Sequence, residues 1–378
     1  MRRLIALTLL SALTLSAFAQ TGSQVLYRGT GDITGAVLTE NGLIIGKETT
    51  AEIVATDIFG SPPRSEIPLP AENQRVFFSP NGRFAVLADY TGQGDYFEIP
   101  QFRVTELASG NEIVITGVPG LSGIFVSDRG TVIGVIRNIN LADKSELLFY
   151  SAEGILLKTI PFPAVTQVKF SPDGGFAGAI SGSRGLVIFT ATGEEVIELG
   201  PCQWFDLAAS ADGIACAYSN GSSIGVFNQG NSSGRWENQF GTEIFRDVAV
   251  SHNAMEIIAV SKHHLYYLDG SGGIIREVHL DAPRSFTTCA LGENISGRKF
   301  AAYGWETDAG RSVHYTQRHT HGGFTLIENP GADGAQEITE ELNYANWNVF
   351  TPDVKFSSRG LLIQTMDEIR YLQLNEER

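Results

Sequence analysis

The sequence has few cysteines, few charged residues and a shortage of basic residues, and each shortage excludes a class of protein. Only Cys202, Cys216 and Cys289 occur among the 378 residues, and no two of them form a C-x-x-C pair. This rules out a disulfide framework and the usual redox and structural zinc motifs, although one bridge stays open. Charged residues make up 18% of the chain and the net charge is −15, which argues against nucleic acid and anionic membranes as partners.

Several enzyme motifs and long apolar runs are missing as well. The sequence contains no H-E-x-x-H, no Walker A loop and no dinucleotide-binding fingerprint. No catalytic residue and no cofactor are therefore predicted, although a triad built from distant residues stays open. Beyond the first twenty residues, no apolar run approaches the roughly 18 residues of a membrane helix, so membrane insertion is not expected.

The first nineteen residues have the parts of a secretory signal peptide in the right order. Met1-Arg2-Arg3 is a short positive start, residues 4–15 are apolar apart from Ser and Thr, and residues 17–19, Ala-Phe-Ala, match a cleavage site. The apolar core is too short for a comfortable membrane span of about 20 residues. We therefore predict a signal peptide at 1–19 and a mature chain, 20–378, that folds as a single domain in the periplasm or outside the cell.

The strongest pattern is a repeat in which a four-residue turn separates two short apolar runs. Ser79-Pro80-Asn81-Gly82 and residues 171–174, Ser-Pro-Asp-Gly, are its clearest copies. Pro fixes the backbone at the early turn position, Asp or Asn bonds its own backbone, and Gly accepts a positive φ. The short β-branched and aromatic runs on either side predict a hairpin around each turn. Related turns lie at 127–130, 210–213 and 357–360, with weaker copies at 39–42, 251–254 and 292–297.

The spacing of these turns predicts a β-propeller. Their closing residues fall at 42, 82, 130, 174, 213, 254, 297 and 360, and most intervals are about 40–50 residues, with room for a third and a fourth strand. We predict an all-β fold of four-stranded blades, eight in number, or seven if one weak copy is spurious. A sandwich or a β-helix is the alternative. Residues 24–27 are expected to close the ring as the outer strand of the last blade.

The turn and its following apolar run resemble a known family of repeats. Ser-Pro-Asp-Gly before an apolar run is similar to the WD40-like repeat of bacterial cell-envelope propellers, the type found in the TolB propeller domain. The resemblance covers nearly the whole mature chain and implies an architecture rather than an activity. The Gly-His and Trp-Asp dipeptides of true WD40 repeats are absent. Residues 190–195 also resemble quinoprotein propeller repeats, but the tryptophan expected after them is missing.

Loops carry the functional surface of a propeller, so the loops opposite the recurring turn are the predicted binding surface. These second-to-third and fourth-to-first connections share one rim, and they supply aromatic and arginine side chains suited to recognition of a protein or peptide. The alternative is a solvated rim whose side chains are individually unimportant. The candidate binding residues are Tyr90, Tyr96, Phe97, Arg137, Arg184, Trp204, His263, Arg284 and Trp305.

Two weaker patterns concern metals, and no metal site is predicted from either. His319 and His321 would share one face of an extended strand, as ligands of a divalent metal can, but no cysteine nearby completes a familiar site. Asp89 and Asp95 belong to an acidic loop with oxygen ligands for Ca²⁺, yet the regular spacing of a calcium loop is absent.

Three hypotheses about function follow. The sequence favours a non-catalytic, monomeric propeller that binds a protein or peptide partner in the cell envelope through one rim, and this hypothesis predicts an unremarkable central channel. The second is an enzyme of the lactonase or quinoprotein type, with a metal or cofactor over the channel. It predicts acids or histidines from several blades converging there. The third is a structural subunit of a larger surface assembly, which predicts a stable oligomer or a large apolar patch.

Overall fold

A computed structural model describes most of the chain, with gaps. The described residues are 23–28, 33–39, 42–47, 51–54, 74–93, 96–136, 145–210, 213–229, 234–294, 296–307, 322–342, 353–357, 360–365 and 368–374. The predicted signal peptide at 1–19 lies outside these ranges and stays a prediction.

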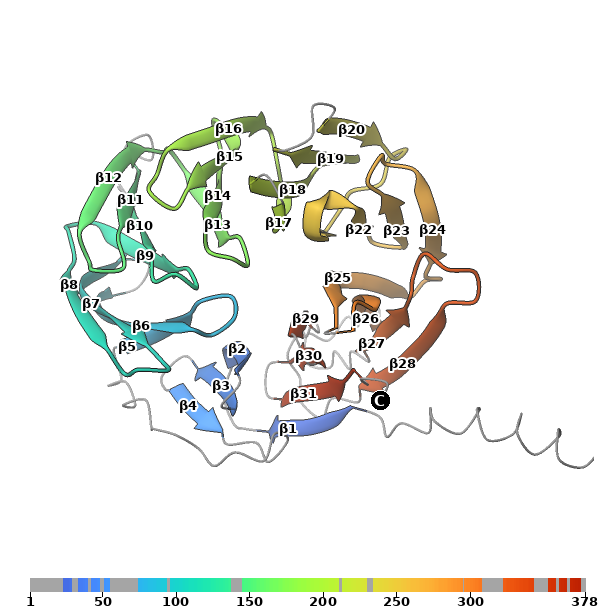
Figure 1. Cartoon of the computed structure of the whole chain (residues 1–378), viewed down its shortest axis with the longest axis horizontal. Coiled ribbons are helices and arrows are strands. Elements are labelled where there is room, and N and C mark those ends of the chain that lie inside the picture. The colour runs from blue at the N-terminus through green and yellow to red at the C-terminus, as the bar shows by residue number, and fades with distance from the viewer. Residues whose placement is uncertain are drawn as a thin grey trace, which may run out of the picture.

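Antiparallel sheets stand side by side around a central axis (Figure 1). The described strands form eight sheets, seven of four strands and one of three, and strands that are neighbours in sequence are neighbours in each sheet. This up-and-down order is that of propeller blades. The predicted all-β propeller is therefore confirmed, against a sandwich or a β-helix. The sheets match the predicted eight blades in number, while the blade count of the whole chain stays a prediction.

The strand bounds follow the predicted order of hairpins along the chain. The first three sheets are β2 (Ile33–Thr39), β3 (Gly42–Lys47) and β4 (Ala51–Val54); β5 (Gln74–Phe78), β6 (Phe84–Gln93), β7 (Tyr96–Glu106) and β8 (Glu112–Thr116); and β9 (Leu121–Val126), β10 (Val132–Ile136), β11 (Glu146–Tyr150) and β12 (Leu156–Pro161). The next two are β13 (Val165–Phe170), β14 (Phe176–Ser181), β15 (Gly185–Thr190) and β16 (Glu195–Gly200); and β17 (Trp204–Ser210), β18 (Gly213–Asn220), β19 (Ser223–Asn228) and β20 (Arg235–Gln239). The last three are β21 (Asp247–Val250), β22 (Glu256–Val260), β23 (His264–Asp269) and β24 (Ile274–His279); β25 (Arg284–Glu293), β26 (Lys299–Thr307), β27 (Gly322–Glu328) and β28 (Gln336–Leu342); and β29 (Asp353–Ser357), β30 (Gly360–Gln364), β31 (Glu368–Gln373) and β1 (Gln24–Arg28).

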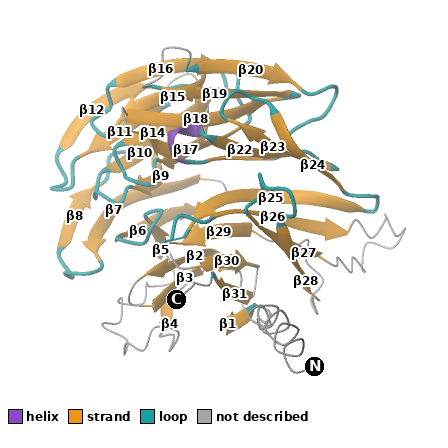
Figure 2. Cartoon of the chain, turned by 45° about the vertical axis from the view of Figure 1, so that its right-hand side comes forward, coloured by secondary structure: helices purple, strands orange, loops and turns teal. Residues whose placement is uncertain are grey.

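Each recurring turn joins the first and second strands of its sheet, as predicted. Between β5 and β6, the amide of Gly82 donates a hydrogen bond to the Ser79 carbonyl at 2.9 Å, and Gly82 has a φ of 67°. The weak copy at 251–254 contains the short 3-10 turn η3 (His252–Ala254), which Figure 2 shows beside β17. There Ala254 takes the left-handed conformation that glycine adopts elsewhere, with a φ of 51°.

The two ends of the described chain meet in one sheet. Strand β1 pairs antiparallel with β31, with Gln24 opposite Tyr371 and Arg28 opposite Glu368. The sheet therefore runs β1-β31-β30-β29, and its outer strand comes from the other end of the sequence. This confirms the predicted closure by residues 24–27. The closure covers the edge that β31 would otherwise expose.

The hydrophobic core lies between neighbouring sheets rather than on the axis. Phe102 and Tyr150, from adjacent sheets, meet edge to face with ring centres 5.9 Å apart. Phe205 is fully buried against the sheet of β14, where a Cβ on Gly178 would lie 2.4 Å from the Phe205 ring. Because burial between the blades supplies most of the hydrophobic stabilisation, the walls of the axis are free to carry polar side chains.

Candidate functional site in the central channel

A cavity of about 710 Å³ lies where the first strands of the sheets face one another. Its lining includes residues of β2, β5, β9, β13, β17, β21, β25 and β29, so every sheet contributes to it. The volume falls in the range of roughly 300–1,000 Å³ that is usual for small-molecule sites. Side chains from blades far apart in the sequence are thus brought to one cavity.

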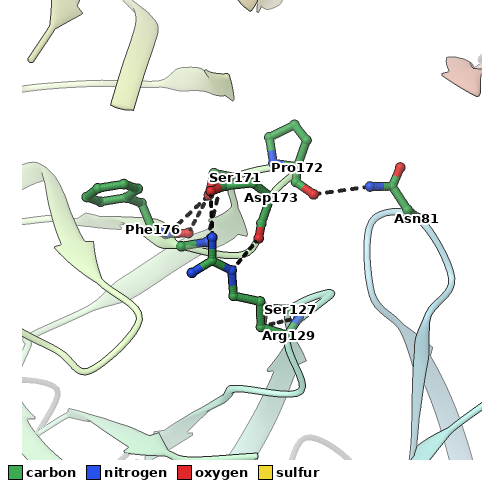
Figure 3. Close-up of polar contacts among 8 residues, drawn as sticks. Asn81, Ser127, Arg129, Ser171, Pro172, Asp173 and Phe176 are labelled. Atoms are coloured by element: carbon green, nitrogen blue, oxygen red, sulfur yellow. Dashed lines mark hydrogen bonds and ion pairs between the residues drawn. The ribbon is translucent and has the colours of Figure 1, made fainter. Parts of the chain in front are cut away.

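The recurring turns of three blades are bonded together at one end of this cavity (Figure 3). The Arg129 guanidinium donates to the Asp173 carbonyl at 2.7 Å and to its carboxylate at 3.0 Å. The Asn81 side-chain amide donates to the Pro172 carbonyl at 3.1 Å, and both residues line the cavity. These bonds cross between blades and fix the margin of the cavity in position.

Five charged residues and one threonine line one side of the cavity, which we call the polar arc. It comprises Lys169, Asp206, Asp247, Thr288, Asp353 and Lys355, from the five blades that begin with β13, β17, β21, β25 and β29. The rim-binding hypothesis predicts an unremarkable channel, and that expectation is wrong. Converging acids are what the second hypothesis predicts.

Two carboxylates of the polar arc reach from their own blade to the next. Asp206 on β17 accepts a hydrogen bond from the Val250 amide on β21 at 3.0 Å. Asp247 on β21 accepts from the Cys289 amide at 3.0 Å and from the Thr288 hydroxyl at 2.8 Å, both on β25. Backbone donors are rigid, so these bonds fix the orientation of each carboxylate and also connect the inner strands.

The two lysines of the polar arc are engaged in different ways. The Lys169 ammonium donates to the Phe205 carbonyl at 2.8 Å and lies 5.5 Å from the centre of the Phe205 ring. The Lys355 ammonium lies 2.9 Å from a carboxylate oxygen of Asp353 on the same strand. Lys169 therefore braces two neighbouring blades, whereas Lys355 forms an ion pair within its own blade.

Burial shifts the titration of the polar arc. Desolvation raises the pKa of Asp206 and Asp247, the latter to about 6, while the charge of Lys169 acts to lower both pKa values. The carboxylate of Asp353 further raises the pKa of Asp247, and it also raises the pKa of Lys355. The groups of the arc therefore interact across the channel, and a charge placed there would act on several of them.

The other side of the channel, which we call the apolar arc, carries no charged group among its described lining residues. It comprises Ala36, Val76, Phe77, Ile124, Phe125 and Val126, from β2, β5 and β9. Phe78, Phe170 and Phe356 add aromatic surface near the turns. The cavity thus joins one charged wall to one apolar wall.

Some predicted rim residues do meet at the end of the propeller away from the turns. The Arg284 guanidinium lies 4.7 Å from the ring centre of Trp305, and the Arg284 carbonyl lies 3.0 Å from Nδ1 of His263. Trp204, at the start of β17, is 40% exposed. Trp305 itself is only 3% exposed, so most of its ring packs in the core beneath Arg284.

Other rim candidates serve their own blade or lie outside the described residues. Arg184 is held by Glu195 at 2.9 Å and by Glu198 at 2.7 Å. Tyr90 is 9% exposed and belongs to a core cluster, and Asp89 is half-buried in the middle of β6. Strand β7 contains Tyr96 and Phe97, whose side chains are not described; Arg137, Asp95, His319 and His321 lie outside the described residues.

The described residues show neither a metal-holding cluster nor a disulfide. Within the described ranges, no group of three or more His, Cys, Asp or Glu side chains is placed to hold a metal ion. All three cysteines are described, and each is a free thiol. Burial raises the pKa of the Cys202 thiol to about 12. The disulfide that the sequence leaves open is therefore not formed.

One sequence pattern resembles a catalytic motif without its structure. Residues 221–225 read G-S-S-I-G, the spacing of a nucleophile elbow. In the structure they form the turn between β18 and β19 and the start of β19. A nucleophile elbow needs a strand-to-helix turn, so this hairpin does not provide one.

The polar arc left a signal in the sequence that motif analysis overlooks. Asp206, Asp247 and Asp353 each stand seven residues before the closing residue of their turn, and Lys169 and Lys355 each stand five before theirs. Aligning the repeats on the turn places these residues at equivalent positions of the first strand. That alignment would have predicted their convergence on the axis.

Comparisons with known proteins leave the family undetermined. No protein-family model matches the sequence, and no curated protein matches it. Solved structures that match include hydrazine synthase from Kuenenia stuttgartiensis, with 16% sequence identity and a TM-score of 0.44, over 66% of this chain and 74% of that one. So low an identity says nothing about a shared activity. The resemblance to WD40-like envelope repeats is not confirmed at the level of a family; the propeller fold is.

Proposed function

We propose that the protein is a non-catalytic binding propeller that holds a small molecule in its central channel. The observation that supports this best is the cavity of about 710 Å³, in which charged side chains from four blades face an apolar wall. Small-molecule sites are usually largely apolar with a few fixed polar groups. Bonds from the neighbouring blade already fix Asp206 and Asp247. A site ordered in advance loses little entropy on binding.

Native mass spectrometry tests this proposal on the protein expressed with its own first nineteen residues and recovered from the periplasm. We expect a retained small molecule that leaves on denaturation. Ala290→Phe, which fills part of the cavity, should lower its occupancy, and Trp204→Ala, outside the cavity lining, should not. A bare protein mass, together with no thermal stabilisation by any member of a small-molecule panel, would contradict the proposal. Circular dichroism checks that each variant keeps its fold.

A second candidate function is the binding of a protein or peptide partner in the cell envelope through the rim opposite the turns. The exposed ring of Trp204 and the exposed side chain of Arg284 favour it, because tryptophan and arginine dominate interface energetics. Partner capture from an envelope fraction should then be lost in Trp204→Ala and Arg284→Ala and kept in Ala290→Phe. The opposite pattern would assign binding to the channel.

The enzymatic alternative shares the channel with the first proposal. Acids from several blades favour it, whereas within the described residues no metal-holding group has been placed. Incubating the retained molecule with fresh protein distinguishes binding from catalysis. Chemical conversion of the molecule would show that the protein is an enzyme.

We also propose that the protein is exported and acts as a monomer outside the cytoplasm. The described residues contain no helix long and apolar enough to cross a membrane. The same mass spectrum tests export, because cleavage at the predicted site gives the mass of residues 20–378, and it reports the oligomeric state directly.

A further inference from the structure

The charges around the cavity do not balance among the described lining residues. Three carboxylates, Asp206, Asp247 and Asp353, face two ammonium groups, Lys169 and Lys355. The arc therefore carries one excess negative charge when all five groups are ionised.

The two lysines differ in whether they neutralise a carboxylate of the arc. Lys355 lies against Asp353 at 2.9 Å, which accounts for one carboxylate. Lys169 points its ammonium at the Phe205 carbonyl at 2.8 Å. Asp206 and Asp247 accept hydrogen bonds from neutral donors on the next blade, namely amides and the Thr288 hydroxyl. Such donors orient a carboxylate without cancelling its charge.

The apolar arc defines the rest of a suitable ligand. Phe77 and Phe125 lie in the wall formed by β5 and β9, with Ile124 and Val126 beside them. Burying the apolar body of a ligand against this wall would be favourable, because it removes apolar surface from water. Aromatic rings also attract a cation held nearby.

We infer that the channel ligand is a cationic amine with an apolar body, its ammonium beside Asp206 and Asp247 and its body against Phe77 and Phe125. This inference rests on the proposed function and adds the chemical class of the ligand. The half-buried position of Asp247 agrees with it, because desolvation raises the pKa of this carboxyl to about 6 although the charge of Lys169 acts to lower it, as expected for an acid without enough positive charge around it. A bound ammonium supplies that charge.

Three matched probes separate the ligand classes: phenethylamine, phenethyl alcohol and hydrocinnamate. They share an aromatic body and differ in carrying a positive charge, no charge or a negative charge. In isothermal titration calorimetry at pH 7.5, we expect the amine to bind at least about tenfold more tightly than the alcohol, since charge-assisted hydrogen bonds are roughly twice as strong as neutral ones. Hydrocinnamate should not bind measurably.

Variants then locate the probe. Asp247→Asn should weaken binding of the amine about tenfold and leave the alcohol unchanged, because it removes charge and preserves shape. Asp206→Asn is the second variant, in case the first does not fold. Phe125→Leu should weaken the amine and the alcohol to a similar extent. Asp281→Asn is the matched control, since this carboxylate is almost fully exposed and does not line the cavity.

Each outcome bears on the inference. Equal binding of all three probes, tighter binding of hydrocinnamate, or no binding of the amine at millimolar concentration would overturn the amine class. The proposed function is judged separately by the native mass spectrum. A retained anion or neutral molecule there would keep channel binding and exclude the amine, whereas an empty channel together with a captured protein partner would exclude both.

Discussion

The two arcs of the channel occupy equivalent positions of one repeat, yet they are built from opposite chemistry. At the position seven residues before the closing residue, the polar arc has Asp206, Asp247 and Asp353, whereas the blade of β9 has Gly123 and the blade of β5 has Arg75. At the position five residues before, Lys169 and Lys355 contrast with Phe125. The backbone is the same in both arcs. The fold therefore does not require either chemistry on the axis, because its core lies between the blades.

The largest effect should come from removing an inter-blade carboxylate. Asp247→Leu leaves the Cys289 amide and the Thr288 hydroxyl without their acceptor, and we expect a loss of about 2–4 kcal/mol in the free energy of unfolding. Urea denaturation measures it. Asp281→Leu, at an exposed position, is the control and should change stability by less than about 0.5 kcal/mol. Equal stability of the two variants would show that the polar arc does not hold the inner strands together.

Placing a charge in the apolar arc should cost nearly as much. Phe125→Lys removes ring contacts in a core cluster and brings an ammonium to a wall without a described carboxylate, so we expect a loss of about 2–3 kcal/mol. Phe125→Leu keeps the wall apolar and should cost about 1 kcal/mol. If both variants lose the same amount, only the volume of the ring matters and the two arcs are not chemically distinct.

The polar arc should also make the free energy of unfolding depend on pH, in the direction opposite to ordinary acid denaturation. Burial raises the pKa of Asp247 from 3.8 to about 6, so the folded state binds this proton more tightly than the unfolded state. Its contribution to stability is present below about pH 4 and is lost as the pH rises through 6, on the order of 3 kcal/mol. Urea midpoints at pH 4, 5, 6 and 7 measure it as the difference between the wild type and Asp247→Asn. A difference that stays constant with pH would mean that Asp247 titrates normally.

The smallest effect is expected at the ion pair that faces the cavity. The side chain of Lys355 is 55% exposed, so water screens its attraction to Asp353. Lys355→Met should therefore change the free energy of unfolding by less than about 1 kcal/mol in urea. By increasing the negative charge of the arc, it should also strengthen amine binding in calorimetry. Weaker amine binding by this variant would contradict the inference that the excess negative charge of the arc holds the amine.

Local chemistry made much of the fold predictable. The turn at 79–82 needs a residue that tolerates positive φ, and the glycine at position 82 makes the turn recognisable in the sequence. The hairpins, the order of strands in a blade and the closing strand at 24–27 follow from such turns and from short apolar runs. Side-chain roles at the rim were less predictable. Trp305 is a core residue and Arg184 serves two glutamates of its own blade, because exposure depends on packing that the sequence does not state.

The sequence by itself determined the repeat, the all-β propeller and the positions at which each hairpin turns, because these depend on residues close together in the chain. Only the tertiary structure decided that Asp206, Asp247 and Lys169 share one cavity with Phe77 and Phe125. Their approach depends on the closure of the ring, which brings together strands more than a hundred residues apart. The desolvation that raises the pKa of Asp206 and Asp247 likewise exists only once neighbouring blades pack around these carboxylates.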